Sequence, residues 1–276
     1  MKRKAYLFLT PSFVGVVLFV LVPFLDVIRR SFWNAMGTKF MGLQNYITVF
    51  QNEAFQRAVW NTARFLFTCI PLLMLVSLLC ALGVESIQKV RELLKTTFLF
   101  PMAIPIASVV LFWKLVFDNH GWLNQIMGCF HLESVDWMNT PAAFHVLVFS
   151  YLWKNTGYFM VLWITGLHSI PESVCEAAKV DGAGAWYRFR YVTLPGLRST
   201  SFAVFILALV NSFKVFREAC LIAGNYPHES IYMLQHLFNN WFVNLDIQKM
   251  SAASVLTAAV MAVILAITQA VNRKEG

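Results

Sequence analysis

One polar segment of this mostly apolar chain has a spacing that predicts binding of a soluble partner. Glu176, Ala177 and Ala178 are followed after three residues by Gly182, and nine residues later by Val192-Thr193-Leu194-Pro195. A polar helix, a glycine break and a proline stop therefore share one short segment. The chain has no GxxxxGK[ST] phosphate loop, no HExxH and no GxSxG, so the residues do not predict catalysis or ATP hydrolysis by this chain.

A second group of polar residues lies inside the apolar runs and predicts a transport pathway. Charge within a membrane is costly and usually faces water or a partner, as we expect for Lys154. The run after Arg198 has a charge-free core of only 15 residues, about 22 Å long, and such short spans mark transport sites. The alternative is that Lys214 and Arg217 extend to the headgroups and that Lys154 forms an ion pair. The pathway candidates are Trp153, Lys154, Asn155, Tyr158, Asn211, Ser212, Lys214 and Phe216.

Other patterns predict packing rather than chemistry. Small residues recur every four positions in the last apolar run, which favours close contact with a neighbouring span or with a second subunit. They are Ser254, Ala258, Ala262 and Ala266. The five cysteines are scattered and His120, Cys129 and His131 lack ligand spacing, so we expect no disulfide framework, metal site or other cofactor.

Composition places these residues in a membrane. The chain is 58% hydrophobic and only 13% charged, about half the charge of a soluble domain. Several long apolar runs predict an all-α integral membrane protein, with the first run retained rather than cleaved as a signal peptide. We expect six spans, at residues 7–29, 61–84, 96–117, 143–168, 199–222 and 250–271.

Basic residues orient these spans. With the N-terminus inside, the inner segments hold twelve Lys and Arg residues and the outer segments five, which places both termini and the Glu176 segment in the cytoplasm. The net charge of +8 does not predict nucleic-acid binding, because the basic residues lie at the ends of the apolar runs rather than in one patch.

The Glu176 segment, residues 169–198, carries helix signals of its own. Ser169 precedes Glu172 by three residues, and Ser173 precedes Glu176 by three, so both pairs fit a capping box. Pro171 suits a first helical turn, and small or apolar residues follow on one face, with a bend expected at Gly182. By periodicity alone, the segment could also be an amphipathic helix that lies on the membrane surface.

The order of residues in the segment resembles the signature of permease subunits of ATP-binding-cassette importers, with Val192 in place of Ile. Further motifs resemble the sugar-permease branch, which includes the maltose and glycerol-3-phosphate uptake systems. Where that branch has a GGP-containing turn, this chain has IAGNYPHES at 222–230. The matching motifs are GLQNY (42–46), NTARF (61–65), FPMAIP (100–105) followed by Trp113, Phe117, Gly121 and Asn124, and NSFKVF (211–216).

The resemblance implies the type I importer architecture in a bacterial inner membrane. Residues 1–56 would form the first helix and outer loop, and residues 57–272 the permease core. The partners implied are two cytoplasmic ATPase subunits, a homologous second permease and an external solute-binding protein. The residues that would couple to the ATPase are Glu176, Ala177, Ala178, Asp181, Gly182, Leu194 and Pro195.

Two other classes stay open on the sequence. An ion-gradient-driven secondary transporter would have acidic residues inside its spans, and only Asp26, near a span end, fits that description. A membrane scaffold or enzyme without transport would function without an ATPase partner. Dependence of uptake on ATP separates the first class from an importer, and co-purification of partners separates the second.

Overall fold

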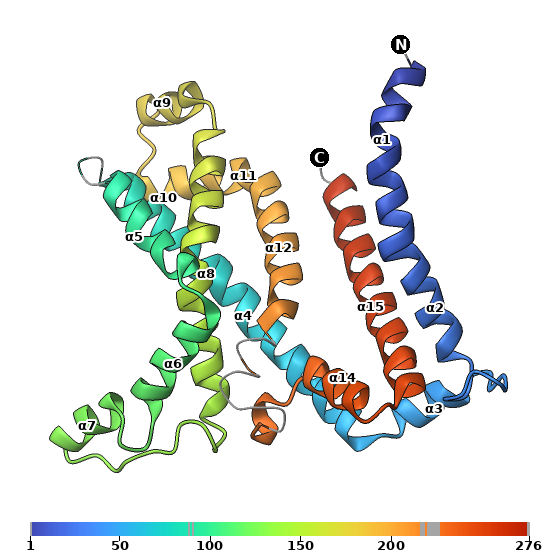
Figure 1. Ribbon diagram of the computed structural model, residues 1–276. Helices are drawn as coiled ribbons and strands as arrows, with labels where there is room; N and C mark the ends of the chain where they lie inside the picture. The colour runs from blue at the N-terminus through green and yellow to red at the C-terminus, as the bar shows by residue number, and fades with distance from the viewer. Residues whose placement is uncertain (1, 88, 90, 216–218, 220–226, 275–276) are drawn as a thin grey trace. The chain divides into compact units, whose positions relative to one another are not determined.

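The computed structural model describes residues 2–87, 89, 91–215, 219 and 227–274 (Figure 1). Two compact units make up the fold: Met1–Val59 together with Leu234–Gly276, and Trp60–Met233. Within the described residues the regular structure is helical, apart from one isolated bridge between Trp33 and Phe40. The expected all-α class is confirmed for this part of the chain.

The first unit brings the two ends of the sequence together. Its opening run is α1 (Lys2–Val16), a π-helical turn (Val17–Leu21) and α2 (Val22–Ser31). The short α3 (Gln44–Phe50) follows, and α14 (Leu234–Val243) and α15 (Ile247–Lys274) close the unit. Helix α15 packs against α2 and α3, and α14 packs against α15.

The GLQNY motif fixes the loop that follows α2. The amide of Asn45 donates hydrogen bonds to the carbonyl oxygens of Ser31 at 2.9 Å and Trp33 at 2.8 Å. The hydroxyls of Ser31 and Tyr46 lie 2.7 Å apart. These bonds satisfy carbonyls at the end of a helix, where the intrahelical partners run out. The motif therefore holds the chain in place at the C-terminal end of α2.

The second unit is built around one long buried helix, α8 (Ala143–His168). Before it in the chain come most of α4 (Glu53–Ser86), α5 (Arg91–Ala103), α6 (Ile106–Phe117) and α7 (Trp122–Cys129). Helix α5 packs against α8, whereas α7 packs against α6. The chain then forms α9 (Glu172–Val180), α10 (Ala185–Arg188), a π-turn (Phe189–Thr193), α11 (Leu194–Gly196) and α12 (Arg198–Ser212). Two short 3₁₀ turns follow, Phe213–Val215 and Glu229–Ile231.

Glycines in α8 set how closely its neighbours approach. A Cβ atom at Gly157 would lie 1.9 Å from the carbonyl oxygen of Phe98, so α5 touches α8 backbone to backbone. A Cβ at Gly166 would lie 2.4 Å from Oγ1 of Thr200 at the start of α12. Small residues allow such contacts between membrane helices, where packing replaces the hydrophobic driving force.

Polar contacts also join the helices of the second unit. Nε1 of Trp163 in α8 donates to Oγ of Ser77 in α4 at 3.0 Å. In the NTARF motif, the Asn61 amide donates to the carbonyl of Glu229 at 2.6 Å, and the Arg64 guanidinium lies 4.0 Å from the centre of the Phe144 ring. The motif therefore joins the start of α4 to two distant parts of the chain.

Prolines explain the irregular turns. Both π-turns, Val17–Leu21 and Phe189–Thr193, are followed two residues later by a proline, Pro23 and Pro195. Proline lacks the N–H of an α-helical bond and its ring crowds the preceding turn, and a wider turn relieves that conflict. At Pro105 the helix breaks instead, so the third expected span consists of two helices.

The structure identifies fewer clear spans than the six expected. Among the residues that the structure describes, three helical runs are long and apolar enough to cross a membrane: Leu9–Ser31, Glu53–Ser86 and Ile247–Val271. Two bent pairs raise the number to five: Arg91–Ala103 with Ile106–Cys129, at 92°, and Ala185–Gly196 with Arg198–Ser212, at 65°. The 26-residue α8 coincides with the fourth expected span. Its mean hydropathy is too low to place it among these runs, because polar residues interrupt it.

Buried His236 in α14, outside the candidate spans, predicts a pH-dependent stability. Burial lowers the pKa of its imidazole from 6.5 to about 4, because the protein solvates the charged form poorly. Below pH 6.5 the unfolded chain therefore binds more protons than the folded chain, and stability falls as the pH falls. We expect the loss to reach about 2 kcal/mol at pH 5. Melting curves of wild type and His236→Gln check this, since equal losses in both would contradict it.

Candidate functional site

The expected docking segment forms a helix whose beginning differs from the expectation. Helix α9 begins at Glu172, and its N-cap residue is Pro171, with no side-chain cap. The Ser169 hydroxyl donates to the carbonyl of Gly166 at 2.7 Å, and Ser173 lies inside α9. Both expected capping boxes are therefore wrong. Pro171 defines the start, because the residue before a proline disfavours helical geometry.

Gly182 ends α9 in a left-handed turn, as the sequence predicted. Its φ angle is +75°, a region that favours glycine. The N–H of Gly182 donates to the carbonyl of Lys179 at 3.1 Å, and the N–H of Ala183 donates to that of Ala178 at 3.0 Å. These two bonds form a Schellman motif, which satisfies carbonyls at the helix end. The small residue thus fixes the direction in which the chain leaves α9.

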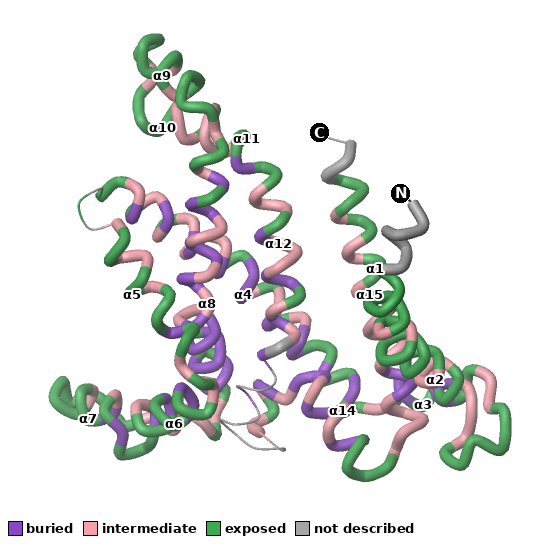
Figure 2. The backbone as a smooth tube through the Cα atoms, turned by 45° about the horizontal axis from the view of Figure 1, so that its top comes forward, coloured by how far each residue is buried: buried purple, intermediate pink, exposed green. Residues whose placement is uncertain are grey.

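The segment exposes most of its side chains (Figure 2). None of the residues of α9 and α10 is buried, in contrast to α8. Glu176, Ala177, Asp181 and Gly182 are exposed, and Ala178 is half-buried. Large apolar side chains are exposed as well: Val180 at 87%, Trp186 at 69%, Val174, Tyr187 and Tyr191. Helices with exposed apolar and small residues favour close contact with another surface.

The two ends of the Glu176 segment contact each other. A Cβ at Gly196 would lie 2.9 Å from side-chain carbons of Ile170, the residue immediately before Pro171. Leu197 is fully buried, and the chain bends by 65° between Ala185–Gly196 and Arg198–Ser212. Leu194 and Pro195 come directly before Gly196. Leu194 is half-buried and Pro195 is exposed. The segment is therefore continuous with α8 on one side and with α12 on the other.

The pathway candidates on α8 lie in different surroundings. The Trp153 ring packs edge-on against Trp113 with centroids 5.3 Å apart, beside a buried cluster that includes Val109, Phe117 and Val146. Lys154 is buried, at 9% exposure. The Asn155 amide donates to the carbonyl of Tyr151 on its own helix at 2.8 Å. Tyr158 is half-buried, with its ring edge-on to Phe159.

The candidates at the end of α12 are only partly described. Ser212 is buried, and its hydroxyl donates to the carbonyl of Leu209 at 2.8 Å. Asn211 is half-buried. Phe216 and the side chain of Lys214 lie outside the described residues. The hydrogen bonds of Asn155 and Ser212 thus return to their own helices, and a facing arrangement of the two groups stays a prediction.

The small-residue stripe of α15 changes character along the helix. Ser254 and Ala258 are half-buried within the first unit, whereas Ala262 and Ala266 are exposed. The first two lie in the half of α15 that packs inside this unit. Contact of the stripe with a second subunit stays a prediction.

Asn124 organises the loop between α6 and α8. Its side-chain oxygen accepts hydrogen bonds from the N–H of Val135 and from Nε1 of Trp137, both at 3.1 Å. Its amide donates to the carbonyls of Asp118 at 3.2 Å, Asn119 at 3.1 Å and Val135 at 2.9 Å. A buried side chain with all its polar atoms used is structural. Among the described residues no cluster of three His, Cys, Asp or Glu side chains could hold a metal.

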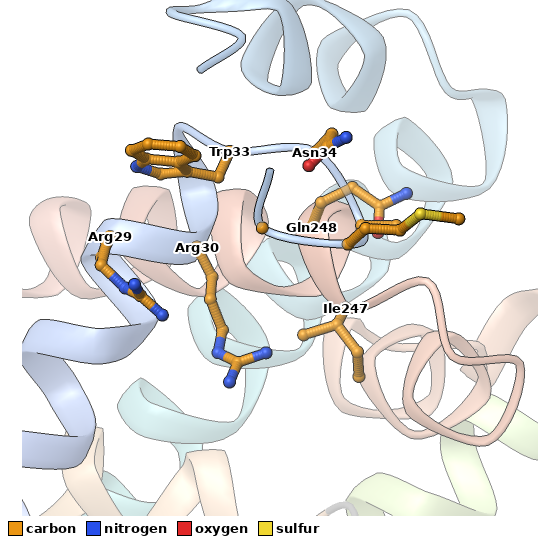
Figure 3. Close-up of a pocket in the computed structure, with 9 residues that line it drawn as sticks. Arg29, Arg30, Trp33, Asn34, Ile247 and Gln248 are labelled. Atoms are coloured by element: carbon orange, nitrogen blue, oxygen red, sulfur yellow. The ribbon is translucent and has the colours of Figure 1, made fainter. Parts of the chain in front are cut away.

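A small cavity of about 160 Å³ lies in the first unit, where α2 ends and α15 begins (Figure 3). Arg29 and Arg30 line it but share the carboxylate of Asp26, at 3.1 and 2.6 Å. The cavity therefore offers little charge that is not already neutralised. Its other lining residues are Trp33, Asn34, Ala35, Met36, Gly37, Ile247 and Gln248.

Comparison with known families decides the identity of this arrangement. The family described as "Binding-protein-dependent transport system inner membrane component" matches residues 65–274, three quarters of the chain. The chain belongs to this family. It is the multi-pass inner-membrane permease subunit of a binding-protein-dependent ATP-binding-cassette importer and is not the catalytic subunit.

Individual relatives extend the match over nearly the whole permease. The trehalose/maltose transport system permease protein MalF of Thermococcus litoralis is 28% identical, over 92% of this chain and 88% of the relative. The diacetylchitobiose uptake system permease protein NgcF of Streptomyces coelicolor is 30% identical, over 96% and 82%. The crystal structure of a bacterial ABC transporter involved in the import of the acidic polysaccharide alginate shares the fold, with a TM-score of 0.87, 21% identity and coverage of 99% and 96%.

Sequence reasoning on the permease missed two features of the second unit. The first is the backbone contact at Gly157, for which a glycine within a span was the available signal. The second is an ionic cluster of Glu85, Arg91 and His168, three residues at the ends of different helices. Nothing in the linear order signals the second feature, because 77 residues separate Arg91 from His168.

Proposed function

We propose that the permease carries a sugar or a sugar-like solute. Its relatives include permeases named for trehalose/maltose and for diacetylchitobiose uptake, and the alginate importer shares its fold. Aromatic and amide side chains near the middle of α8 suit such solutes, because aromatic rings stack on sugar rings and amides bond hydroxyls. The candidates for these contacts are Trp153, Lys154, Asn155, Tyr158, Asn211, Ser212, Lys214 and Phe216.

The proposed topology has six spans with both termini in the cytoplasm. Three continuous runs, two bent pairs and α8 make six. Helix α8 has 26 residues and is about 39 Å long, enough to cross about 30 Å of hydrocarbon. Polar residues lower the mean hydropathy of α8. A helix that lines a water-filled path tolerates such residues.

The proposed coupling element is the segment from Pro171 to Leu197. The main observation behind this proposal is that α9 exposes small and apolar residues. In addition, the two ends of the segment contact each other, between the end of α8 and the start of α12. Glu176 would pair with a basic residue of the ATPase, and Ala177, Ala178 and Gly182 would permit a close approach. Asp181, Leu194 and Pro195 complete the element. Closure of the ATPase pair would then move α8 and α12 as rigid bodies.

The assembly that we propose contains two ATPase subunits, a homologous second permease and an external solute-binding protein in a lipid membrane. A related alginate transporter has been crystallised with an alginate-bound periplasmic protein, which supports the presence of an external solute-binding protein. Within the chain, residues 1–56 would form the first helix and outer loop, and residues 57–272 the permease core. Contacts of Ala262 and Ala266 would belong to the interface with the second permease.

Co-purification tests the proposed coupling. The permease is expressed with its candidate ATPase subunits, extracted in a mild detergent, and the retained ATPase is quantified. We expect Glu176→Lys to reduce retention about tenfold, because a repelled charge replaces an ion pair. Glu92→Lys, at an exposed glutamate of α5 outside the coupling element, is the control and should retain the ATPase. Equal retention in wild type and Glu176→Lys would refute the assigned role of Glu176.

A further inference from the structure

Three ionisable side chains meet where α4 ends, α5 begins and α8 ends. Nε of Arg91 lies 2.9 Å from Oε1 of Glu85, and Nε2 of His168 lies 2.9 Å from Oε2 of the same carboxylate. Nη2 of Arg91 lies 2.6 Å from Nε2 of His168. Glu85 and Arg91 are only 20% and 27% exposed, and His168 is half-exposed. Each residue thus contacts the other two, and each comes from a different helix.

The cluster lies immediately before the coupling element. His168 is the last residue of α8, three positions before Pro171. A force that reaches α8 from α9 must pass through the end of α8 that carries His168. The contacts with Glu85 and Arg91 extend that end to α4 and α5. The other contacts named above lie further along α8, at Trp163 to α4 and at Gly157 to α5, so the cluster is the tie nearest to the coupling element.

We propose that Glu85, Arg91 and His168 are positioning residues for coupling, which join α8 to α4 and α5 so that the three helices move together when the coupling element is displaced. The proposal rests on the proposed coupling role of α9. It adds residues outside that segment to the machinery of transport.

The assembled complex of permease and ATPase subunits tests the tie. ATP hydrolysis by the complex is measured and is divided by hydrolysis by the isolated ATPases. We expect this ratio to fall about two- to fivefold in Glu85→Gln and in Arg91→Gln, the range for a partly exposed ion pair. The exchange Glu85→Arg with Arg91→Glu should restore it.

The charge exchange separates this role from simple stabilisation, because it restores the ion pair with both charges reversed. Glu92→Gln breaks an ion pair within α5 alone and should leave the ratio unchanged. An unchanged ratio in both single variants, or a failed exchange, would overturn the proposal. A wild-type chain that retains no ATPase would instead refute the proposed function itself.

Discussion

Replacement of Gly182 by valine is expected to reduce ATPase docking and coupled hydrolysis about tenfold while the permease still inserts into the membrane. Gly182 has a φ angle of +75°, and a branched side chain there costs about 1–2 kcal/mol, which corresponds to roughly a tenfold change in an equilibrium. No atom lies within 4 Å of the position of an added Cβ, so the cost comes from the backbone and not from a clash. Retained ATPase and ATP hydrolysis per complex are the measurements.

Gly184, two residues further on, supplies the matched control. It also has no atom within 4 Å of an added Cβ, but its φ angle of −65° suits any residue. Gly184→Val should therefore couple nearly as well as wild type. Gly182→Asn should be intermediate, since asparagine tolerates the left-handed region better than other residues. Normal docking by Gly182→Val would show that the direction of the chain after α9 has no part in coupling.

Replacement of Gly157 by leucine is expected to have the largest effect on folding. The added Cβ would lie 1.9 Å from the carbonyl oxygen of Phe98 and 2.4 Å from its carbonyl carbon, so backbone atoms of α5 must move. Overpacking in a core costs about 1–3 kcal/mol even where flexible side chains can yield, and a backbone yields less. We expect a loss of about 3 kcal/mol or more, measured as a reduced melting temperature and a low yield of folded protein in detergent.

A glycine in open surroundings isolates this steric effect. Gly83 lies in α4, and no atom outside its own helix backbone lies within 4 Å of an added Cβ. Gly83→Leu should leave the melting temperature unchanged or raise it slightly, because glycine is a poor helix former. Similar melting temperatures for Gly157→Leu and Gly83→Leu would contradict the close contact of α5 and α8.

The membrane class and the coupling turn could be predicted from the sequence because both depend on local chemistry. Long runs without charge are needed to cross hydrocarbon, so composition alone indicates the spans. The turn at Gly182 depends on the φ angle of one residue, and a glycine at the end of a helical pattern signals that geometry. The fourth expected span, residues 143–168, coincides with α8 because its boundaries are near Pro141 and Pro171.

Where several local signals competed, the sequence was less informative. Ser169 and Ser173 both offered capping boxes, but Pro171 defined the start of α9, because its ring restricts the preceding residue. Pro101 and Pro105 were expected to kink the third span or to set its entry, but Pro101 lies inside α5, and at Pro105 the chain breaks, with a 92° bend between Arg91–Ala103 and Ile106–Cys129. Whether a proline kinks, widens or ends a helix depends on what packs around it, and the linear order does not contain that information.

What this sequence determined by itself is therefore a membrane permease with an exposed helix and a glycine turn between two apolar runs. The tertiary structure alone decided which distant residues meet. It placed Gly157 against the backbone of Phe98, Gly196 against Ile170, and Glu85 and Arg91 around His168. The physical reason is range: hydropathy, capping and φ angles act over a few neighbouring residues. Contacts between helix ends depend on how whole helices cross, which the sum of many packing interactions fixes.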